Sequence, residues 1–301
     1  MKMDETEFSI IIPVALYRDA EVLNSLNNVD YPKEKYEIVV EKGTNPSENR
    51  ALGIKKAKFG TLIFLDDDAC VEKDFLKNVN DFFSLYPDID IVGGVQLTPH
   101  NDNRFAKISG IALSSYFGAY KMKNRYFGKK VNLDATEKDL TSAICVIKKH
   151  VFDKIGGFNP SYFPGEDPDL FIRAKKNNFK IASDPNIVIY HKRRPTFSSF
   201  VKQIYFYGRV RPKISKNFLT SVFIVPSLFL LYLIMLPLLL FFSWLCLLPL
   251  LAYTVLALIF SAYDSIKHNS IFAFILLPFL YFTMHISYGV GFFHGLLKKH
   301  N

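Results

Sequence analysis

Three consecutive carboxylates end an apolar run in the segment TLIFLDDDAC, residues 61–70. Adjacent carboxylates repel one another and disfavour a strand, so such a cluster is typical of a place where a positive group lies nearby. Mg²⁺ and Mn²⁺ prefer oxygen ligands and bridge readily to phosphate. Asp66, Asp67 and Asp68 therefore predict a metal site that serves nucleotide-diphosphate chemistry, with Asp66 and Asp68 on the same side of the chain. The competing interpretation is a solvated turn that caps the next helix.

A second acidic segment, PGEDPD at residues 164–169, could supply a general base. Asp167 followed by Pro168 is a strong signature of a helix N-cap, and a helix N-terminus favours an ionised carboxylate. A base that accepts a proton from a sugar hydroxyl must start ionised and within hydrogen-bond reach. The capping and catalytic interpretations of Asp167 are therefore compatible.

His191 ends the strand-like segment NIVIY and precedes three cationic residues. An isolated histidine is more often a surface or packing residue. At a strand end beside cations it could instead be a third metal ligand or contact a diphosphate. The sequence leaves both interpretations open.

The elements that would position these residues alternate between strands and helices. The apolar runs FSIIIPV, YEIVV, TLIFL, IDIVGG and NIVIYH are separated by helical segments at about 20–28, 46–58, 74–85 and 168–177. This order predicts an α/β domain with a mostly parallel sheet covered on both faces. In open sheets of this kind, ligands bind beyond the carboxyl ends of the strands, where the three aspartates fall. Residues 98–142 are less regular, and the aromatic and basic stretch at 114–130 predicts a loop near the acceptor.

Half of the 301 residues are hydrophobic, and the excess lies near the C-terminus. Residues 217–263 contain no Asp, Glu, Lys or Arg, and residues 270–297 form a second uncharged run. A spanning helix needs about 20 apolar residues, so these runs suffice for two spans and one span. The predicted domains are a catalytic domain at 1–215 and a membrane region at 216–301. Segment length favours three spans, whereas the positive-inside rule favours two spans and an interfacial helix.

The chain has a net charge of +9, and a cluster of basic residues stands just before the first apolar run. Its members are Lys192, Arg193, Arg194, Lys202, Arg209, Arg211, Lys213 and Lys216. A cationic cluster beside a membrane segment indicates contact with anionic lipid or diphosphate head groups, and it argues against a nucleic-acid partner. Three unpaired cysteines predict neither a disulfide nor a zinc site, and the acidic N-terminus does not resemble a signal peptide. The catalytic domain is therefore expected in the cytosol, attached to the cytoplasmic membrane.

With these motifs in order, the chain resembles a family 2 glycosyltransferase with a GT-A fold. The matching segments are SIIIPV, YEIVV, NPSENRALGIKKAKFG, FLDDD, the Gly93-Gly94 pair, IGGFNPSYFPGEDPDLFIRAKKNNFKI and DPNIVIYHKRRP. They cover residues 8 to about 215. The segments SSYFGAY, FVKQIYFYGRVRP and HISYGVGFFHGLL are similar to a membrane-anchored subgroup that extends lipid-linked exopolysaccharide repeat units, as in succinoglycan biosynthesis.

The resemblance implies a role for each matching residue. Asp167 would be the catalytic base and Glu166 would support the acceptor side, while Asp66 and Asp68 would serve the nucleotide and its Mn²⁺ or Mg²⁺. The remaining assignments concern the rim of the nucleotide-sugar pocket and the acceptor. Pro13, Glu41, Asn49, Arg50 and Asp67 would border the nucleotide sugar, and Gln203, Arg209 and Arg211 would contact the acceptor or its diphosphate.

Two departures from the family pattern limit what it implies. The usual acidic pair after the second strand is Glu41-Lys42 here, and the Q-x-x-R-W motif of processive synthases is missing after Gln203. The sequence therefore predicts an inverting, metal-dependent enzyme that moves a single sugar from a UDP-sugar to a glycan on a polyprenyl diphosphate. The alternatives are transfer to a polyprenyl monophosphate, processive synthesis, and an inactive membrane-anchored module that binds nucleotide sugars.

Overall fold

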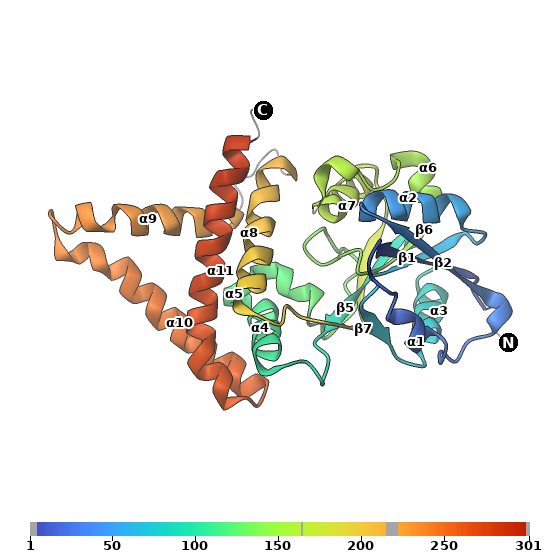
Figure 1. Cartoon of the computed structure of the whole chain (residues 1–301), viewed down its shortest axis with the longest axis horizontal. Coiled ribbons are helices and arrows are strands. Elements are labelled where there is room, and N and C mark those ends of the chain that lie inside the picture. Colours follow the sequence, from blue (N-terminus) through green and yellow to red (C-terminus); the bar gives the residue numbers. More distant parts are fainter. Residues whose placement is uncertain (1–4, 164, 215–221, 299–301) are drawn as a thin grey trace. The chain divides into compact units, whose positions relative to one another are not determined.

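The computed structural model describes residues 5–163, 165–214 and 222–298, so Pro164 and Lys216 lie outside the described part of the chain. The chain folds as two compact units, one formed by Met1–Pro99 and Asn124–Lys192, the other by His100–Lys123 and Arg193–Asn301 (Figure 1). Residues 100–123 and 193–214 thus group with the C-terminal helices. The functional boundary predicted at residue 215 stays a prediction.

The first unit is built on a sheet whose strands lie in the order β2-β1-β3-β6-β5-β7-β4. Strands β1 and β2 pair in parallel, as do β1 and β3, and β5 and β7. Strand β6 runs antiparallel between β3 and β5, and β4 runs antiparallel to β7. The α/β class is confirmed, but the sheet is mixed rather than mostly parallel. The bounds are β1 Phe8–Ala15, β2 Tyr36–Gly43, β3 Thr61–Leu65, β4 Ala69–Val71, β5 Ile91–Leu97, β6 Ile144–Lys148 and β7 Ile181–His191.

The α-helices described in this unit are α1 Val22–Leu26, α2 Pro46–Lys56, α3 Phe75–Leu85, α6 His150–Ile155 and α7 Glu166–Lys176. All but α6 lie close to helical segments predicted from the sequence. Asn45 caps α2 as its sequence predicts, because its side chain accepts a hydrogen bond from the Ser47 N–H at 2.9 Å. The apolar residues spaced along α3 are buried as one stripe against the sheet.

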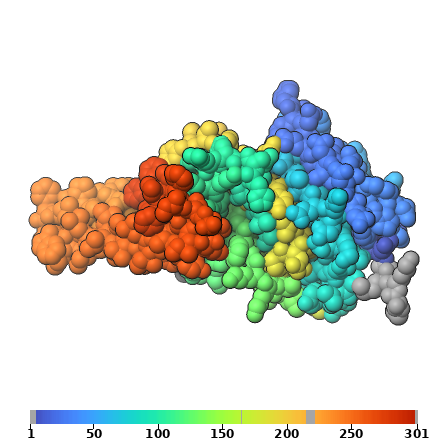
Figure 2. All heavy atoms as spheres, turned by 90° about the horizontal axis from the view of Figure 1, so that it is seen from below, coloured from blue at the N-terminus to red at the C-terminus, as the bar shows by residue number. Residues whose placement is uncertain are grey.

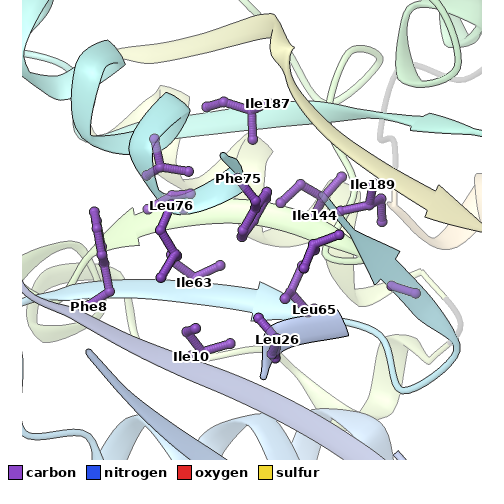
Figure 3. Close-up of a cluster of buried hydrophobic side chains, with 14 of the residues drawn as sticks. Phe8, Ile10, Leu26, Ile63, Leu65, Phe75, Leu76, Ile144, Ile187 and Ile189 are labelled. Carbon is purple, nitrogen blue, oxygen red and sulfur yellow. The ribbon is translucent and has the colours of Figure 1, made fainter. Parts of the chain in front are cut away.

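Both faces of the sheet are covered, which explains why its strands are apolar without interruption. In β1, Ile10 and Ile12 belong to one hydrophobic cluster and Ile11 to the other. The first cluster packs under α1 and α3, where Phe75 and Leu26 meet the sheet (Figure 3). Side chains that alternate between the two faces of the buried strands therefore form two hydrophobic cores. Polar residues stand at the ends of the strands.

The second unit is helical in its described part. It contains α4 Arg104–Ser114, α5 Tyr116–Ala119, α8 Phe197–Ile214, α9 Val225–Leu239, α10 Leu248–Lys267 and α11 Ile271–Leu297. The stretch at 114–130 was expected to be a loop, but it contains α5 and a 3-10 helix at Tyr120–Arg125. Val222–Leu239, Trp244–Lys267 and Ile271–Leu297 are long and apolar enough to cross a membrane.

Candidate active site

Two strand ends bring Asp66, Asp68 and His191 together in the first unit. Asp66 and Asp68 follow β3, and His191 ends β7. The His191 Nε2 lies 3.1 Å from an Asp68 carboxylate oxygen and 3.4 Å from one of Asp66. One ligand atom from each residue lies within 4.8 Å of the others, close enough to hold one metal ion. The sequence prediction that Asp66 and Asp68 face the same side therefore agrees with the structure.

The imidazole and the carboxylates of this cluster shift one another's pKa values. Burial alone would lower the pKa of His191, but hydrogen bonds to Asp66 and Asp68 outweigh it and raise the pKa to about 9. Burial would conversely raise the pKa of Asp68, yet His191 and Arg18 hold it well below its ordinary value. Two ionised carboxylates thus surround a protonated imidazole. A divalent ion in place of that proton would neutralise both carboxylates, and two carboxylate oxygens with one imidazole nitrogen form a donor set that can hold a divalent ion such as Mn²⁺.

Arg18, which the sequence reasoning did not single out, is the second cation beside the aspartates. It follows β1, and its guanidinium lies 3.0 Å from a carboxylate oxygen of Asp68 and 3.2 Å from one of Asp67. Burial raises the pKa of Asp67 to about 6, and the charge of Arg18 offsets this only in part. Asp67 is therefore paired with Arg18 and is not a member of the metal-type cluster.

Arg50 links the cluster to the second acidic segment. Its Nη2 lies 3.1 Å from an Asp66 oxygen, and its Nη1 lies 3.0 Å from a Glu166 oxygen. The guanidinium also lies over the ring of Phe158, 5.2 Å from its centroid. Arg50 and Glu166 are both buried, so α2 is tied to α7 through one cation. The expected contact of Arg50 with the nucleotide stays a prediction.

Asp167 is held by the segment before β6. One of its carboxylate oxygens accepts hydrogen bonds from the Ser142 N–H at 2.8 Å and from the Thr141 hydroxyl at 3.2 Å. The other oxygen, Oδ1, is buried and has no hydrogen-bond partner among the described residues. The N-cap of α7 is Gly165, so the interpretation of Asp167 as the cap is wrong, and the acidic residues occupy the first turn instead. There they lie where the helix dipole favours negative charge.

The pKa of Glu166, the neighbour of Asp167, is raised well above its ordinary value. Burial raises its pKa to about 7, the charge of Asp167 adds to the rise, and Arg50 opposes it. Arg50 also pairs with Asp66, and its charge offsets the effect of burial on Glu166 only in part.

The other residues expected around the nucleotide lie on β1, β2 and α2. Pro13 is opposite Glu41 in the parallel pairing of β1 and β2. The buried Glu41 carboxylate accepts from Lys56 at 2.7 Å. Asn49 is also buried and donates to the Val14 carbonyl at 3.1 Å, which anchors α2 to β1.

The residues expected on the acceptor side lie on α8, in the second unit. Gln203 donates from its amide to the Tyr207 hydroxyl at 3.1 Å, one turn further along the helix. Arg209 lies over the ring of Phe206, 5.9 Å from its centroid. Arg211 is buried, with its guanidinium 3.4 Å from the centroid of Phe223. Their roles toward an acceptor remain predictions.

The family model described as "Glycosyltransferase like family 2" matches residues 5–205, about two thirds of the chain. The chain belongs to this family. Its α/β domain is thus of the glycosyltransferase type, and the expectation drawn from the sequence is confirmed.

Three proteins similar to this chain bear on its family and fold. A mannosyltransferase from Pyrobaculum calidifontis, solved with GDP-Man and Mn²⁺, is 14% identical with a TM-score of 0.55, covering 97% of this chain and 88% of that one. This likeness shows a GT-A-like fold. A Methanococcus voltae protein named dolichyl N-acetyl-alpha-D-glucosaminyl phosphate 3-beta-D-2,3-diacetamido-2,3-dideoxy-beta-D-glucuronosyltransferase is 24% identical over 96% of this chain and 97% of its own length. S. aureus TarS is 17% identical with a TM-score of 0.47, and 67% of this chain covers 39% of that chain.

The sequence carried a signal for some of the site but not for all of it. The two acidic segments and His191 were found because each follows a strand or begins a helix. Arg18 was missed because a single cation in a loop has no spacing pattern, although its place after β1 puts it at the carboxyl edge of the sheet. Thr141 and Ser142 were missed because their contact with Asp167 spans about 25 residues of sequence.

Proposed function

We propose that this protein is an inverting, metal-dependent glycosyltransferase that moves one sugar from a UDP-sugar to a sugar carried on a polyprenyl lipid. Membership of the glycosyltransferase family supports the reaction class. The observation that carries the finer proposal is the cluster of Asp66, Asp68 and His191, whose ligand atoms lie within 4.8 Å of one another. A GT-A-like neighbour was solved with GDP-Man and Mn²⁺, which supports a metal-assisted donor site of this kind.

Asp66, Asp68 and His191 would hold the metal, which when bound supplies positive charge beside the departing diphosphate. Asp167 would accept the proton of the acceptor hydroxyl, and its buried Oδ1, which has no partner among the described residues, is the free acceptor for that proton. The hydroxyl oxygen then bonds to the anomeric carbon as the bond from that carbon to the diphosphate oxygen breaks. Attack from the face opposite the leaving group inverts the anomeric centre.

Arg50 and Arg18 would have different parts in this reaction. Arg50 is buried and fixes Asp66 and Glu166 relative to each other, so we assign it a positioning role. Arg18 is half exposed, with 49% of its side chain accessible, and it already pairs with Asp67 and Asp68. If Asp68 served as a metal ligand, Arg18 would keep its contact with Asp67, and its Nη2 could pair with a phosphate oxygen of the donor.

The acceptor is proposed to be lipid-linked for two reasons. The Methanococcus voltae relative is named for a sugar carried on dolichyl phosphate, and this chain holds three helices apolar enough to cross a membrane. The cations of α8 suit the phosphates of a lipid carrier. The catalytic domain would lie on the cytosolic side of the cytoplasmic membrane.

A transfer assay tests this function. Full-length protein in membranes would be given UDP-sugars and GDP-sugars in turn, with Mn²⁺ and with a sugar on either a polyprenyl phosphate or a polyprenyl diphosphate. We expect nucleotide release from a UDP-sugar that requires both the glycolipid and the metal. Equal release in EDTA would contradict the metal dependence. Release that requires only unglycosylated polyprenyl phosphate would replace the proposed acceptor, and products of many sugars would indicate processive synthesis.

A further inference from the structure

Helix α11 lies in very close contact with α8, a helix that carries cationic side chains. A Cβ atom placed on Gly291 would overlap the carbonyl oxygen of Tyr205, and one placed on Gly295 would overlap that of Arg209. The two contacts advance by four residues along each helix in the same direction. Helices α8 and α11 therefore run parallel, with their backbones touching at small residues.

The contact with charged helices extends toward the other end of α11. The ring of Phe197, at the start of α8, stacks on Phe279 with centroids 5.4 Å apart. Further back, the Arg104 guanidinium of α4 lies over the ring of Phe272, 5.4 Å from its centroid. Contacts with α4 or α8 thus occur along most of the length of α11. The cations of these two helices are Arg104, Lys107, Lys202, Arg209, Arg211 and Lys213.

A helix that crosses the bilayer places its close neighbours in hydrocarbon as well. If α11 crossed, most of α8 and part of α4 would have to lie at membrane depth, where charged side chains are costly. If α11 lies along the surface, these cations apart from the buried Arg211 can reach the head groups and water, and their aliphatic stems cover apolar surface. An interfacial helix normally has a polar face of its own. Here α4 and α8 supply that face, which explains why α11 carries no charge.

The hairpin formed by α9 and α10 has the opposite character. Residues 217–263 contain no charged side chain, and Ser227 is the one residue of α9 that is buried among those described. At the tip, Phe241 is 88% exposed, Phe242 80% and Trp244 71%. Figure 2 shows the hairpin, in orange, projecting beyond the other helices of its unit. A continuous apolar surface of this kind fits the interior of a bilayer.

We propose that only the α9–α10 hairpin enters the bilayer and that α11 lies along the membrane surface together with α4 and α8. Lys298, at the end of α11, then lies on the same side of the membrane as the catalytic unit. The inference rests on the membrane attachment in the proposed function and concerns the side of the membrane on which each segment lies. It favours the interfacial alternative over the three spans that segment length suggested.

Single cysteines in full-length protein test this arrangement. Cys70 and Cys246 are replaced by serine, and the fully buried Cys145 is kept. Lys298→Cys reports the end of α11, Asp88→Cys reports the catalytic unit, and Ser243→Cys reports the tip of the hairpin. Sealed membrane vesicles of each orientation are treated with a membrane-impermeant thiol reagent, a measurement that requires no transferase activity.

We expect the cysteines at positions 298 and 88 to be labelled in the same vesicle orientation, and the one at 243 to be protected from that side. Labelling of positions 298 and 88 from opposite sides would show that α11 crosses and would overturn the proposal. Labelling of position 243 from the side of position 88 would show that the hairpin does not enter the bilayer, which would also overturn it. Equal melting temperatures of the three variants and the parent protein show that the substitutions leave the fold intact.

Discussion

Arg50 and Glu166 form a buried ion pair, with the guanidinium Nη1 3.0 Å from a carboxylate oxygen. The same guanidinium reaches Asp66 at 3.1 Å through Nη2. A side chain of α2 thus sets the distance between the end of β3 and the start of α7. The strand end carries two residues of the metal-type cluster, and the helix start carries the proposed base. The contacts of Arg50 therefore fix the position of one relative to the other.

Replacing Arg50 with methionine is expected to destabilise the protein by about 3–5 kcal/mol, because the buried Glu166 loses its cation and Asp66 keeps only His191. The measurement is the unfolding of full-length protein in detergent. The double variant Arg50→Met, Glu166→Gln should be more stable than the single variant, since one unpaired acid is then neutral. Lys55→Met, at an exposed position of the same helix, is the matched control and should change little. A loss below about 1 kcal/mol in Arg50→Met, within the range of exposed ion pairs, would argue against the pair.

The raised pKa of Glu166 predicts a pH dependence of stability. Its pKa of about 7 lies above the ordinary value of 4.5, so the folded protein favours the protonated form. The stabilisation is complete below pH 4.5 and is lost as the pH rises through 7. The melting temperature of the metal-free protein should therefore fall between pH 5 and pH 8 by a few degrees more than that of Glu166→Gln. Parallel curves for the two proteins would rule out this titration.

Asp167→Asn should keep the fold and donor binding but lose at least about a hundredfold in turnover, the lower end of what a general base contributes. The amide oxygen can still accept from the Ser142 N–H and the Thr141 hydroxyl, but it cannot take the proton. Asp169→Asn, which removes the charge that pairs with Arg173 on the same helix, is the control and should retain activity. If Asp167→Asn stays within about tenfold of the parent, the base is another residue.

Much of the fold was predictable because its signals are local. Asn45 and Pro46 fix the start of α2, and the alternation of Ile10, Ile11 and Ile12 fills two cores. The reversed direction of β6 was not predictable, since antiparallel pairing of Cys145 with Phe64 and Gly93 depends on tertiary packing alone. Strand β4 was missed because three residues are too short to show a period.

The candidate site was predictable where like charges stand next to one another although they disfavour a strand. Three adjacent aspartates after β3 are such a place, and His191 at the end of β7 could be joined to them only once the strand order was known. The prediction that Asp167 is the N-cap of α7 was wrong, because its carboxylate makes a tertiary contact instead. Its carboxylate accepts from the Ser142 N–H instead of from its own helix, and α7 begins at Glu166, two residues before the predicted start at Pro168.

Calorimetry of UDP with Mn²⁺ or with EDTA measures the metal-dependent nucleotide binding proposed for Asp66, Asp68 and His191. We predict that Mn²⁺ strengthens UDP binding to the parent protein and that Asp68→Ala abolishes this gain. Asp67→Asn should keep most of the gain, because Asp67 pairs with Arg18 outside the cluster. An undiminished effect of Mn²⁺ on UDP affinity in Asp68→Ala would contradict the account.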